Sequence, residues 1–518
     1  MRAAHSYCCW LPEVLLAVWL CGTGMVGARP VEITVLHTTD IHGNLLPTSD
    51  YDGHHDVGGL LRCATRIEEI RAEKANVLLV DSGDLIQGSA VSYLTQGRST
   101  IRAMEYLRYD AWTFGNHEFD WGLSPLLALH NATKLPMLAA NIVGRPGQAN
   151  PFGRLKPYIV REVDGVKVVI VGLITPGVPT WSTPDLLGDT LFERSLPALS
   201  RIMPHVQAEN PDILLLTTHQ GYRPYGDDHA NEVNAIAQAY PEFDAILGGH
   251  SHQPVEKALV GGHTLYSQAG YYGIWLGQLD LTFDTVTRQL VQKQARLHRM
   301  DSGIPLHTGL MAVVEQDITA SRAYLEQEVG ETAAPLTERS DALGRSDIQQ
   351  LICRALAEAT GADLVLHGVL DEAQLPAGPV HMSDVWGIVP YENRAAMITV
   401  TAGELTDILN ENLAHRGSIQ FMGPYGFTYA TEGQGGAQRA IHIRLADGSI
   451  PHPRQRLKLC VNSYVVASGG KRFPRLREIA EQPESRLRLL EVQTREAVVS
   501  YLKAHRGLSP ESLRQGAR

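Results

Sequence analysis

The first half of the chain alternates short apolar runs with longer amphipathic stretches. Between residue 31 and about residue 285, the apolar runs show little alternation with polar residues. Strands of this kind are typical of sheets covered on both faces, so we expect a layered α/β domain. The predicted strands are Val31–Leu36, Asn76–Val80, Val166–Leu173, Asp212–Leu216 and Asp244–Leu247, and the predicted helices include Leu60–Ala75, Arg98–Leu107 and Ala230–Ala239.

The second half of the chain begins with a different pattern. Residues 309–329 form one amphipathic stretch without a strand signal near it, which predicts a connecting helix. From about residue 336 a new series of elements starts with the predicted helix Asp347–Ala359, and the glycines at 433–436 mark a loop inside it. We therefore expect a first domain over residues 29–300, a helical linker over 301–335 and a second domain over 336–510.

The N-terminus resembles a secretory signal peptide. Arg2 and His5 form a weakly cationic start, and the apolar core Val14–Leu20 is too short to span a bilayer, which needs about 20 residues. Val26-Gly27-Ala28 supplies the small residues of a cleavage site. We expect residues 1–28 to be removed, and a secreted or periplasmic protein without a stable membrane anchor. The alternative is a buried first helix.

Composition narrows the class of partner. The 518 residues include 45 Lys and Arg against 56 Asp and Glu, a net charge of −11. An acidic protein repels polyphosphate backbones, which argues against a nucleic-acid polymer as partner and leaves a small anion at a local positive site open. The 21 histidines, many beside Asp, Asn and Gly, suggest metal chemistry. Nothing in the sequence indicates an oligomeric state.

Three cysteines remain after the predicted signal peptide, namely Cys63, Cys353 and Cys460. Three thiols cannot all pair, and each lies in an apolar context. We expect buried free thiols, with a bridge between Cys353 and Cys460 as the alternative.

Five predicted strands deliver Asp, Asn or His at their carboxyl ends, which is where open α/β sheets place their functional sites. Each short motif alone is as typical of a turn or a sheet-edge histidine as of a metal site. Five of them in succession indicate one constellation. The segments are Thr39-Asp40-Ile41-His42, Ser82-Gly83-Asp84, Gly115-Asn116-His117-Glu118-Phe119-Asp120, Thr217-Thr218-His219 and Gly249-His250-Ser251-His252.

These residue types suit two divalent cations about 3.5–4 Å apart, which need a shared carboxylate and neutral nitrogen or amide ligands. Asp84 is the expected bridge, because the glycine before it allows close approach of the backbone. Asp40, His42 and His252 would complete the coordination shell of one ion. Asn116, His219 and His250 would complete the coordination shell of the other. Zinc, manganese and iron all suit these ligands, and a water held by such ions becomes a nucleophile near neutral pH.

His117 is then free of metal and follows a ligand directly. We expect it to protonate or polarise the leaving oxygen, with Asp120 orienting it if a helix begins at Glu118. The alternative for His117 is plain packing at a helix start. Glu118 is interpreted as a helix-start charge.

At these segments the chain resembles the calcineurin-like metallophosphoesterases and, more narrowly, the secreted 5′-nucleotidase family with its UDP-sugar hydrolase and cyclic-nucleotide phosphodiesterase relatives. The resemblance also rests on Gly83-Asp84-Leu85-Ile86-Gln87-Gly88 and Phe119-Asp120-Trp121-Gly122. It implies an α/β fold, a four-layer α/β/β/α sandwich followed by a smaller α/β substrate-binding domain. It implies the same division of ligands and the same His117–Asp120 pair.

The second domain resembles the family less closely. Two aromatic rings hold the base in that family, and Tyr391 and Tyr464 stand in about those places, with Asn393 in the segment Pro390-Tyr391-Glu392-Asn393. The alternative is that both tyrosines are core-edge residues. The segment expected to end in a phosphate-binding arginine appears as His367–Glu372, while Arg345 lies about one residue from another family arginine. Lys471 and Arg472 are candidates to restore the positive charge.

The resemblance implies metal-dependent hydrolysis of phosphate esters of nucleotides outside the cytoplasm. The alternatives are a cyclic-nucleotide phosphodiesterase, a UDP-sugar hydrolase or a thiosulfohydrolase on the same centre. A protein of a different class, which kept the fold and binds a ligand without turnover, is a further alternative.

Overall fold

Strand β1 (Val31–Thr38) shows why the first half of the chain forms layers. Ile33 packs into one apolar cluster, and Leu36 packs into another cluster on the opposite face. Successive side chains of a strand point to opposite faces, so both faces of this strand are covered. Strand β9 (Ile213–Thr218) alternates in the same way between two clusters. The expectation of sheets buried on both faces is confirmed.

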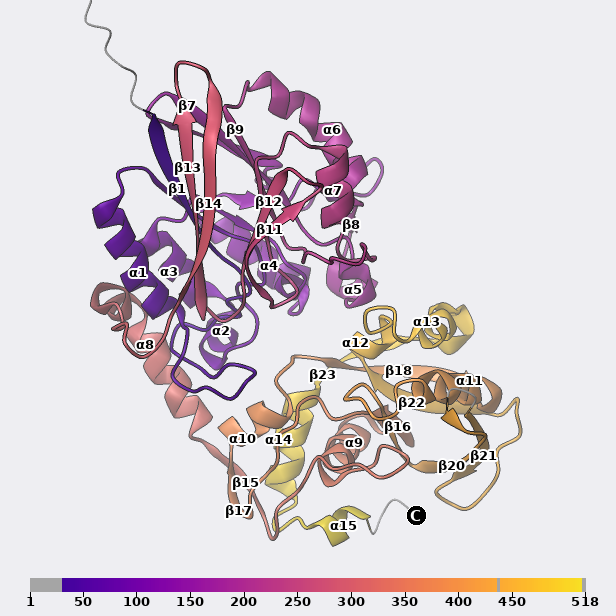
Figure 1. The fold of residues 1–518 in the computed structure, drawn as a ribbon. Helices are drawn as coiled ribbons and strands as arrows, with labels where there is room; N and C mark the ends of the chain where they lie inside the picture. The colour runs from indigo at the N-terminus through magenta and orange to yellow at the C-terminus, as the bar shows by residue number, and fades with distance from the viewer. Residues whose placement is uncertain (1–29, 436–437, 515–518) are drawn as a thin grey trace, which may run out of the picture.

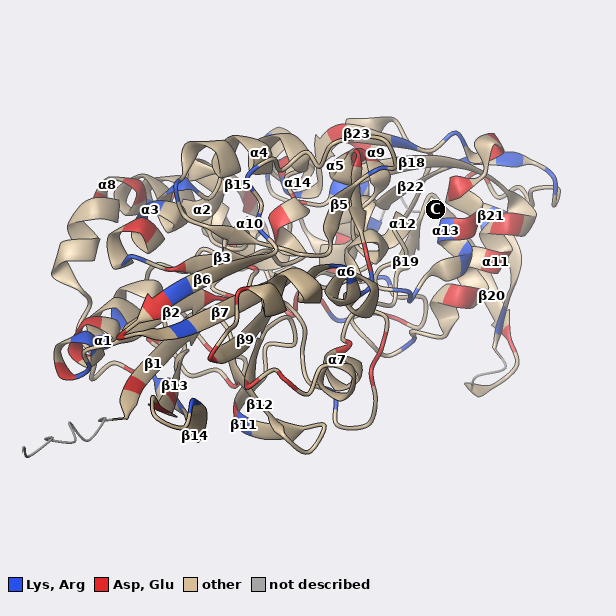
Figure 2. Ribbon diagram, turned by 90° about the horizontal axis from the view of Figure 1, so that it is seen from above, with Lys and Arg blue, Asp and Glu red and all other residues tan. Residues whose placement is uncertain are grey.

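The computed structural model describes residues 30–435 and 438–514, which form two α/β bodies (Figure 1). The predicted signal peptide, residues 1–28, lies outside the described residues. Helix α8 (Thr308–Leu325) runs beside the first body towards the second. Figure 2 shows basic and acidic residues side by side on helix α1 (Leu60–Glu73), so charge of both signs occurs on this outer helix.

Two six-stranded sheets face each other in the first body, with an apolar cluster between them. Strands β1 to β4 are parallel to one another, as are β7, β9, β10 and β12. The first sheet has the order β14 (Gln289–Arg299), β13 (Trp275–Asp284), β1, β2 (Val77–Asp81), β3 (Ala111–Thr113), β4 (Met137–Leu138). The second has the order β11 (Pro254–Val260), β12 (Thr264–Ala269), β10 (Ala245–Gly248), β9, β7 (Val166–Leu173), β6 (Tyr158–Val163).

Helices cover the outer faces of both sheets. Helices α1, α3 (Arg98–Leu107) and α4 (Leu123–Ala132) share a cluster with the first sheet, and α6 (Ser195–Ala208) and α7 (Val233–Ala239) share one with the second. This order of layers confirms the predicted α/β/β/α sandwich. The smaller elements are α2 (Ala90–Thr95), η1 (His117–Phe119), η2 (Val178–Thr180), α5 (Pro184–Leu187) and the strand pair β5 (Ile142–Gly144) and β8 (Thr190–Phe192).

The second body has one central sheet with an apolar cluster on each face. Its order is β19 (Gly423–Tyr425), β16 (Leu364–His367), β22 (Arg456–Asn462), β18 (Arg394–Thr401), β23 (Arg488–Gln493). Helices α9 (Asp347–Thr360), α10 (Met382–Ile388) and α14 (Thr494–Ala504) pack on one face, and α11 (Ala402–Leu413) and α13 (Pro474–Glu481) on the other. The remaining elements are β15 (Glu328–Thr332), β17 (Gly378–His381), β20 (Phe427–Glu432), β21 (Arg439–Leu445), α12 (Ser463–Val466), η4 (Pro483–Ser485) and α15 (Pro510–Arg514).

The connecting helix is shorter than its pattern predicts. It ends at Leu325, and strand β15 begins at Glu328, inside the stretch predicted as helix. Val329 is buried in a cluster of the second body, and β15 pairs with β17. Tertiary pairing therefore overrides the local helical pattern at this end. The predicted loop at 433–436 lies between β20 and β21, and residues 436–437 lie outside the described residues.

The three cysteines are free and buried, as expected. Cys63 belongs to the cluster under α1. Cys353 and Cys460 share a cluster of the second body without forming a bridge.

A buried ion pair lies at the contact between the two bodies. Arg495 is 2% exposed and Glu392 is 5% exposed, with 2.8 Å between the guanidinium and the carboxylate. The other carboxylate oxygen accepts a hydrogen bond of 2.8 Å from the Gln87 side chain of the first body. The guanidinium also lies 3.5 Å from the ring centroid of Trp386, whose indole N–H donates to the carbonyl of Gly88. Glu392 is thus held from both bodies at once.

Replacing Arg495 by Met should destabilise the protein strongly. The substitution leaves the Glu392 carboxylate buried without its cation, which costs about 3–5 kcal/mol. Chemical denaturation of the metal-free protein measures the loss. The matched control is Arg475→Met, because Arg475 pairs with Asp407 while both side chains are about half exposed, and such surface pairs contribute about 0–1 kcal/mol. Equal losses in the two variants would contradict the role given to the buried pair.

Candidate active site

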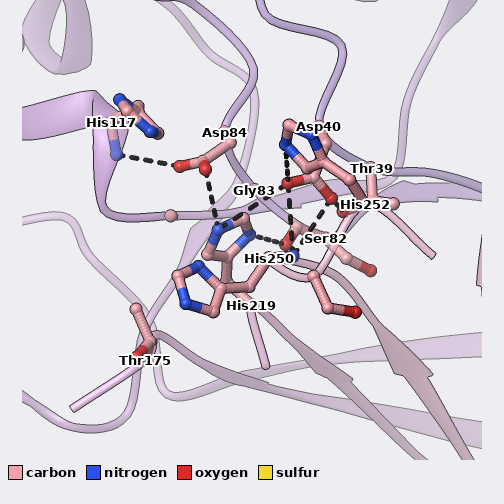
Figure 3. Close-up of polar contacts among 12 residues, drawn as sticks. Thr39, Asp40, Ser82, Gly83, Asp84, His117, Thr175, His219, His250 and His252 are labelled. Atoms are coloured by element: carbon pink, nitrogen blue, oxygen red, sulfur yellow. Dashed lines mark hydrogen bonds and ion pairs between the residues drawn. The ribbon is translucent and has the colours of Figure 1, made fainter. Parts of the chain in front are cut away.

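The five predicted strand ends meet in one place, and they come from two different sheets. Strands β1, β2 and β3 belong to the first sheet, and β9 and β10 belong to the second. Their carboxyl ends face each other at one edge of the sandwich, where Asp40, Asp84, His219, His250 and His252 converge (Figure 3).

One group of donors consists of Asp40, His42 and His252, whose ligand atoms all lie within 4.8 Å of one another. Nε2 of His252 lies 3.3 Å from Oδ1 of Asp40 and 3.1 Å from Nε2 of His42. Asp40 and His42 are buried, and His252 is half-buried at the rim.

A second group consists of Asp84, His219 and His250, with the same spacing of donors. Oδ2 of Asp84 lies 2.9 Å from Nε2 of His219 and 3.9 Å from Nε2 of His42 in the first group. Asp84 therefore belongs to the second group and also approaches the first, as expected for a bridging carboxylate. Asn116 is also buried, and its Oδ1 has no hydrogen-bond partner.

The backbone at this site is strained. Asp40, His42, Asp84, His250 and His252 have φ values of 51°, 50°, 53°, 71° and 56°. Non-glycine residues adopt this left-handed region rarely, and such residues cluster at functional sites. Gly83 and Gly115 allow the turns to pack closely, because a Cβ on Gly83 would lie 2.7 Å from Nδ1 of His219 and one on Gly115 would lie 2.2 Å from Asp84.

The electrostatics of the cluster favour ionised carboxylates beside imidazoles. Burial raises the pKa of Asp84, but His219 and His117 outweigh it and hold this pKa well below its usual value. Burial lowers the pKa of His219, whereas Asp84 and Asp40 raise it, with a net result of about 9. Burial lowers the pKa of His42 and of His250 to about 3, so both rings are neutral and able to donate a lone pair.

These donors fit divalent ions. Two carboxylates and four imidazoles converge in a mostly buried place, together with an amide oxygen that has no other partner. Buried charges require partners or metal ions, and this mixture of oxygen and nitrogen donors suits transition metals or zinc.

His117 lies beside the two groups rather than within either of them. Its Nδ1 lies 2.7 Å from Oδ2 of Asp120, and its backbone N–H donates to Asp84 over 2.8 Å. Burial lowers its pKa, but Asp120 and then Asp84 raise it, to about 10. The element here is the 3-10 turn His117–Phe119, and α4 starts only at Leu123. A 3-10 turn has three residues per turn and still places residues three apart on one side.

Glu118, which the sequence pattern indicates as a helix-start charge, holds several backbone N–H groups. Its buried carboxylate accepts backbone hydrogen bonds from Asp84, Leu85 and Ile86 at 3.0, 2.7 and 3.3 Å. It accepts another from Gly115. Glu118 thereby joins the turn after β2 to the turn after β3. No local pattern distinguishes this carboxylate from a helix-start charge.

A cavity of about 610 Å³ opens beside these donors and is lined by both bodies. Tyr391, Asn393 and Tyr464 line it from the second body, and His117 and His250 line it from the first. The ring of Tyr391 lies nearly parallel to that of His117, with 6.4 Å between centroids. The structure thus brings the predicted ring pair to the same cavity as the predicted acid.

Of the three basic residues considered for phosphate binding, only Arg472 lines the cavity. Arg345 pairs with Asp341 at 2.8 Å and is not among the described residues that line the cavity. Arg472 lines the cavity and donates to the hydroxyl of Tyr464 over 2.5 Å, whereas Lys471 is absent from the described lining.

Trp181 also lines the cavity from the first body, although the sequence pattern did not single it out. Its ring centroid lies 5.0 Å from that of His250. The signal was available, because Trp181 follows the carboxyl end of β7, one strand along from β9 in the same sheet.

Two family matches follow one another along the chain. Residues 33–254 match the calcineurin-like phosphoesterase family, and residues 327–478 match the 5′-nucleotidase C-terminal domain. The first match spans all of the predicted metal ligands, and the second includes Tyr391, Asn393 and Tyr464.

The chain is also similar to curated proteins. It is 30% identical to a snake venom 5′-nucleotidase of Crotalus adamanteus over 375 residues, which is 67% of this chain and 62% of the relative. It is 26% identical to endonuclease YhcR of Bacillus subtilis over 501 residues, 92% of this chain. The chain spans only 40% of that relative's length.

The fold matches a solved structure. A 5′-nucleotidase precursor from Thermus thermophilus superposes with a TM-score of 0.70 at 22% identity, covering 92% of this chain and 97% of the other. The two family matches and the similarity to the venom 5′-nucleotidase show that the chain belongs to the 5′-nucleotidase family, with a calcineurin-like phosphoesterase domain followed by a 5′-nucleotidase C-terminal domain.

Proposed function

We propose that this protein hydrolyses phosphate esters of extracytoplasmic nucleotides at a dinuclear metal centre. The observation that carries the proposal is the position of Asp84, which belongs to one three-residue donor group and also approaches His42 of the other, beside a cavity lined by both domains. The family membership agrees with this chemistry.

Asp40, His42 and His252 would hold one ion, Asn116, His219 and His250 the other, and Asp84 would contact both. Such ions supply Lewis-acid charge for the phosphate and a water nucleophile near neutral pH. His117 holds its Nδ1 on Asp120, which leaves Nε2 free to donate a proton to the leaving oxygen. Tyr391 and Tyr464 would stack on the base, and Asn393 lies beside them on the cavity wall.

The residues expected to bind the phosphate differ from those that the family resemblance implies. Glu372 stands where the resemblance places a phosphate-binding arginine, and Arg345 is engaged by Asp341. A phosphate diester carries one negative charge, whereas a monoester carries up to two. The loss of a cation at this position therefore favours cyclic nucleotides, whose single phosphate is singly charged, as the second candidate. A nucleotide sugar such as UDP-glucose carries one charge on each of its two phosphates and is the other alternative on the same centre.

The location outside the cytoplasm is proposed from the apolar core Val14–Leu20 and the small residues before Arg29. Among the residues that the structure describes, no helix has both the length and the apolar character needed to cross a membrane.

A substrate panel tests the proposal. Purified protein is supplied with manganese or zinc, or with a chelator, and given 5′-AMP, 5′-UMP, ribose 5-phosphate, cyclic AMP, UDP-glucose and bis-p-nitrophenyl phosphate. We expect chelator-sensitive phosphate release from the monophosphates, with lower KM for those that carry a base. Metal-dependent cleavage of diesters alone, detected by product analysis, would assign the second candidates. Silence across the panel in metal-loaded protein would indicate a binding protein.

Asp84→Asn should abolish turnover, because the amide cannot supply the negative charge that two neighbouring cations share. Phosphate release from the best panel substrate and metal content by mass spectrometry check this. The control is Asp244→Asn, a half-buried carboxylate at the opposite end of β10 that accepts the N–H of Leu214, as an amide oxygen also can. Unchanged activity in Asp84→Asn would overturn the metal centre.

His117→Gln should lower kcat by about 10²–10⁴-fold while the metal content stays unchanged, because the substitution removes a proton donor and no ligand. The loss should be much smaller for p-nitrophenyl phosphate, whose leaving group needs little protonation. His298→Gln, on β14, is the control. Equal losses for a nucleotide and for p-nitrophenyl phosphate would argue against His117 as the acid.

A further inference from the structure

An exposed loop of the first body carries a side chain to the rim of the donor cluster. Residues 48–57 leave and rejoin the body through the bridge between Thr48 and Val57. The buried carboxylate of Asp50 accepts the backbone N–H groups of Asp52 and His54 and pairs with Arg299 at 2.9 Å. The loop is therefore fixed from within.

Tyr51 occupies the outer turn of this loop. Its side chain is 64% exposed, yet its position is defined from two directions. The ring stacks on Tyr271 with 4.2 Å between centroids and 14° between planes. The Tyr51 backbone N–H donates to the hydroxyl of the same Tyr271 over 2.9 Å.

The hydroxyl of Tyr51 lies 2.6 Å from Nδ1 of His252. The opposite ring nitrogen of His252 faces Oδ1 of Asp40 at 3.3 Å and Nε2 of His42 at 3.1 Å. A histidine that offers Nε2 to an ion must carry its proton on Nδ1, and a phenol oxygen can accept that proton in a hydrogen bond.

Two other histidines of the cluster are held in the same manner by a different kind of partner. Nδ1 of His42 lies 2.8 Å from the carbonyl of Gln87, and Nδ1 of His219 lies 2.8 Å from the carbonyl of Ser82. Those partners are main-chain groups of buried turns. His252 differs from both, because its partner is a side chain on an exposed loop.

We propose that Tyr51 is a positioning residue, which orients His252 and raises the affinity for the ion at Asp40, His42 and His252. The inference rests on the proposed dinuclear centre. It assigns Tyr51 no contact with the substrate. In the second group, His219 is held by the main chain and not by this loop.

The test measures metal binding to the Tyr51→Phe variant, prepared free of metal. This variant keeps the ring stack and removes only the hydroxyl. Calorimetric titration with zinc or manganese should show two ions in the unchanged protein. In the variant the dissociation constant of one ion should rise about 10- to 100-fold, while that of the other stays the same. Asp40→Asn identifies the weakened site, and Tyr51→Phe added to it should leave the remaining ion unaffected. Tyr225→Phe, a fully exposed tyrosine elsewhere, is the matched control.

The thermal midpoint of the metal-free protein separates positioning from structure. An unchanged midpoint in Tyr51→Phe, together with one weakened ion, supports the proposal. Equal dissociation constants in Tyr51→Phe and the unchanged protein overturn the role of Tyr51 and leave the dinuclear centre intact. A lowered midpoint together with weaker binding of both ions overturns the positioning role and indicates a structural role for Tyr51. Fewer than two ions in the unchanged protein overturns the dinuclear centre and this inference together.

Discussion

The convergence of two carboxylates and four imidazoles in one mostly buried place is the constraint on which the rest of this structure depends. Burial penalises the charge on Asp40 and Asp84, and the neighbouring histidines offset that penalty. Each carboxylate faces a histidine of both groups. Asp84 lies 2.9 Å from His219 and 3.9 Å from His42, and Asp40 lies 3.3 Å from His252 and 4.0 Å from His219. A cluster of this kind requires that several chain segments be held rigidly at close range.

The surrounding structure meets that requirement largely with the main chain. Five of the candidate ligands adopt left-handed backbone conformations, and Glu118 secures the turns that carry Asp84 and Asn116 through backbone N–H groups. Carbonyls of buried turns orient His42 and His219. The sandwich thus supplies rigidity where the strand ends meet, and the loop with Tyr51 is the one side-chain contribution among these three histidine contacts.

The second body completes the cavity rather than the donor cluster. Glu392, which pairs with Arg495, lies between Tyr391 and Asn393 in the sequence. Gln87, which follows the turn that carries Asp84, donates a hydrogen bond to the same carboxylate. The segment that presents the Tyr391 ring to the cavity is therefore tied to the loop that presents Asp84. This contact sets the distance between the groups proposed for chemistry and those proposed for recognition.

The sequence by itself determined the kind of fold, the free thiols and the strand ends that carry Asp, Asn and His, because apolar strands and the polar residues that follow them are local patterns. It did not reveal that these ends belong to two sheets or that Glu118 joins two turns. Nor did it show that Arg345 is engaged by Asp341 or that Tyr51 reaches His252. Those facts depend on which distant segments pack together, and a contact such as Tyr51 with His252, which are 201 residues apart, leaves no periodic or local signal in the chain. Only the tertiary structure decided them.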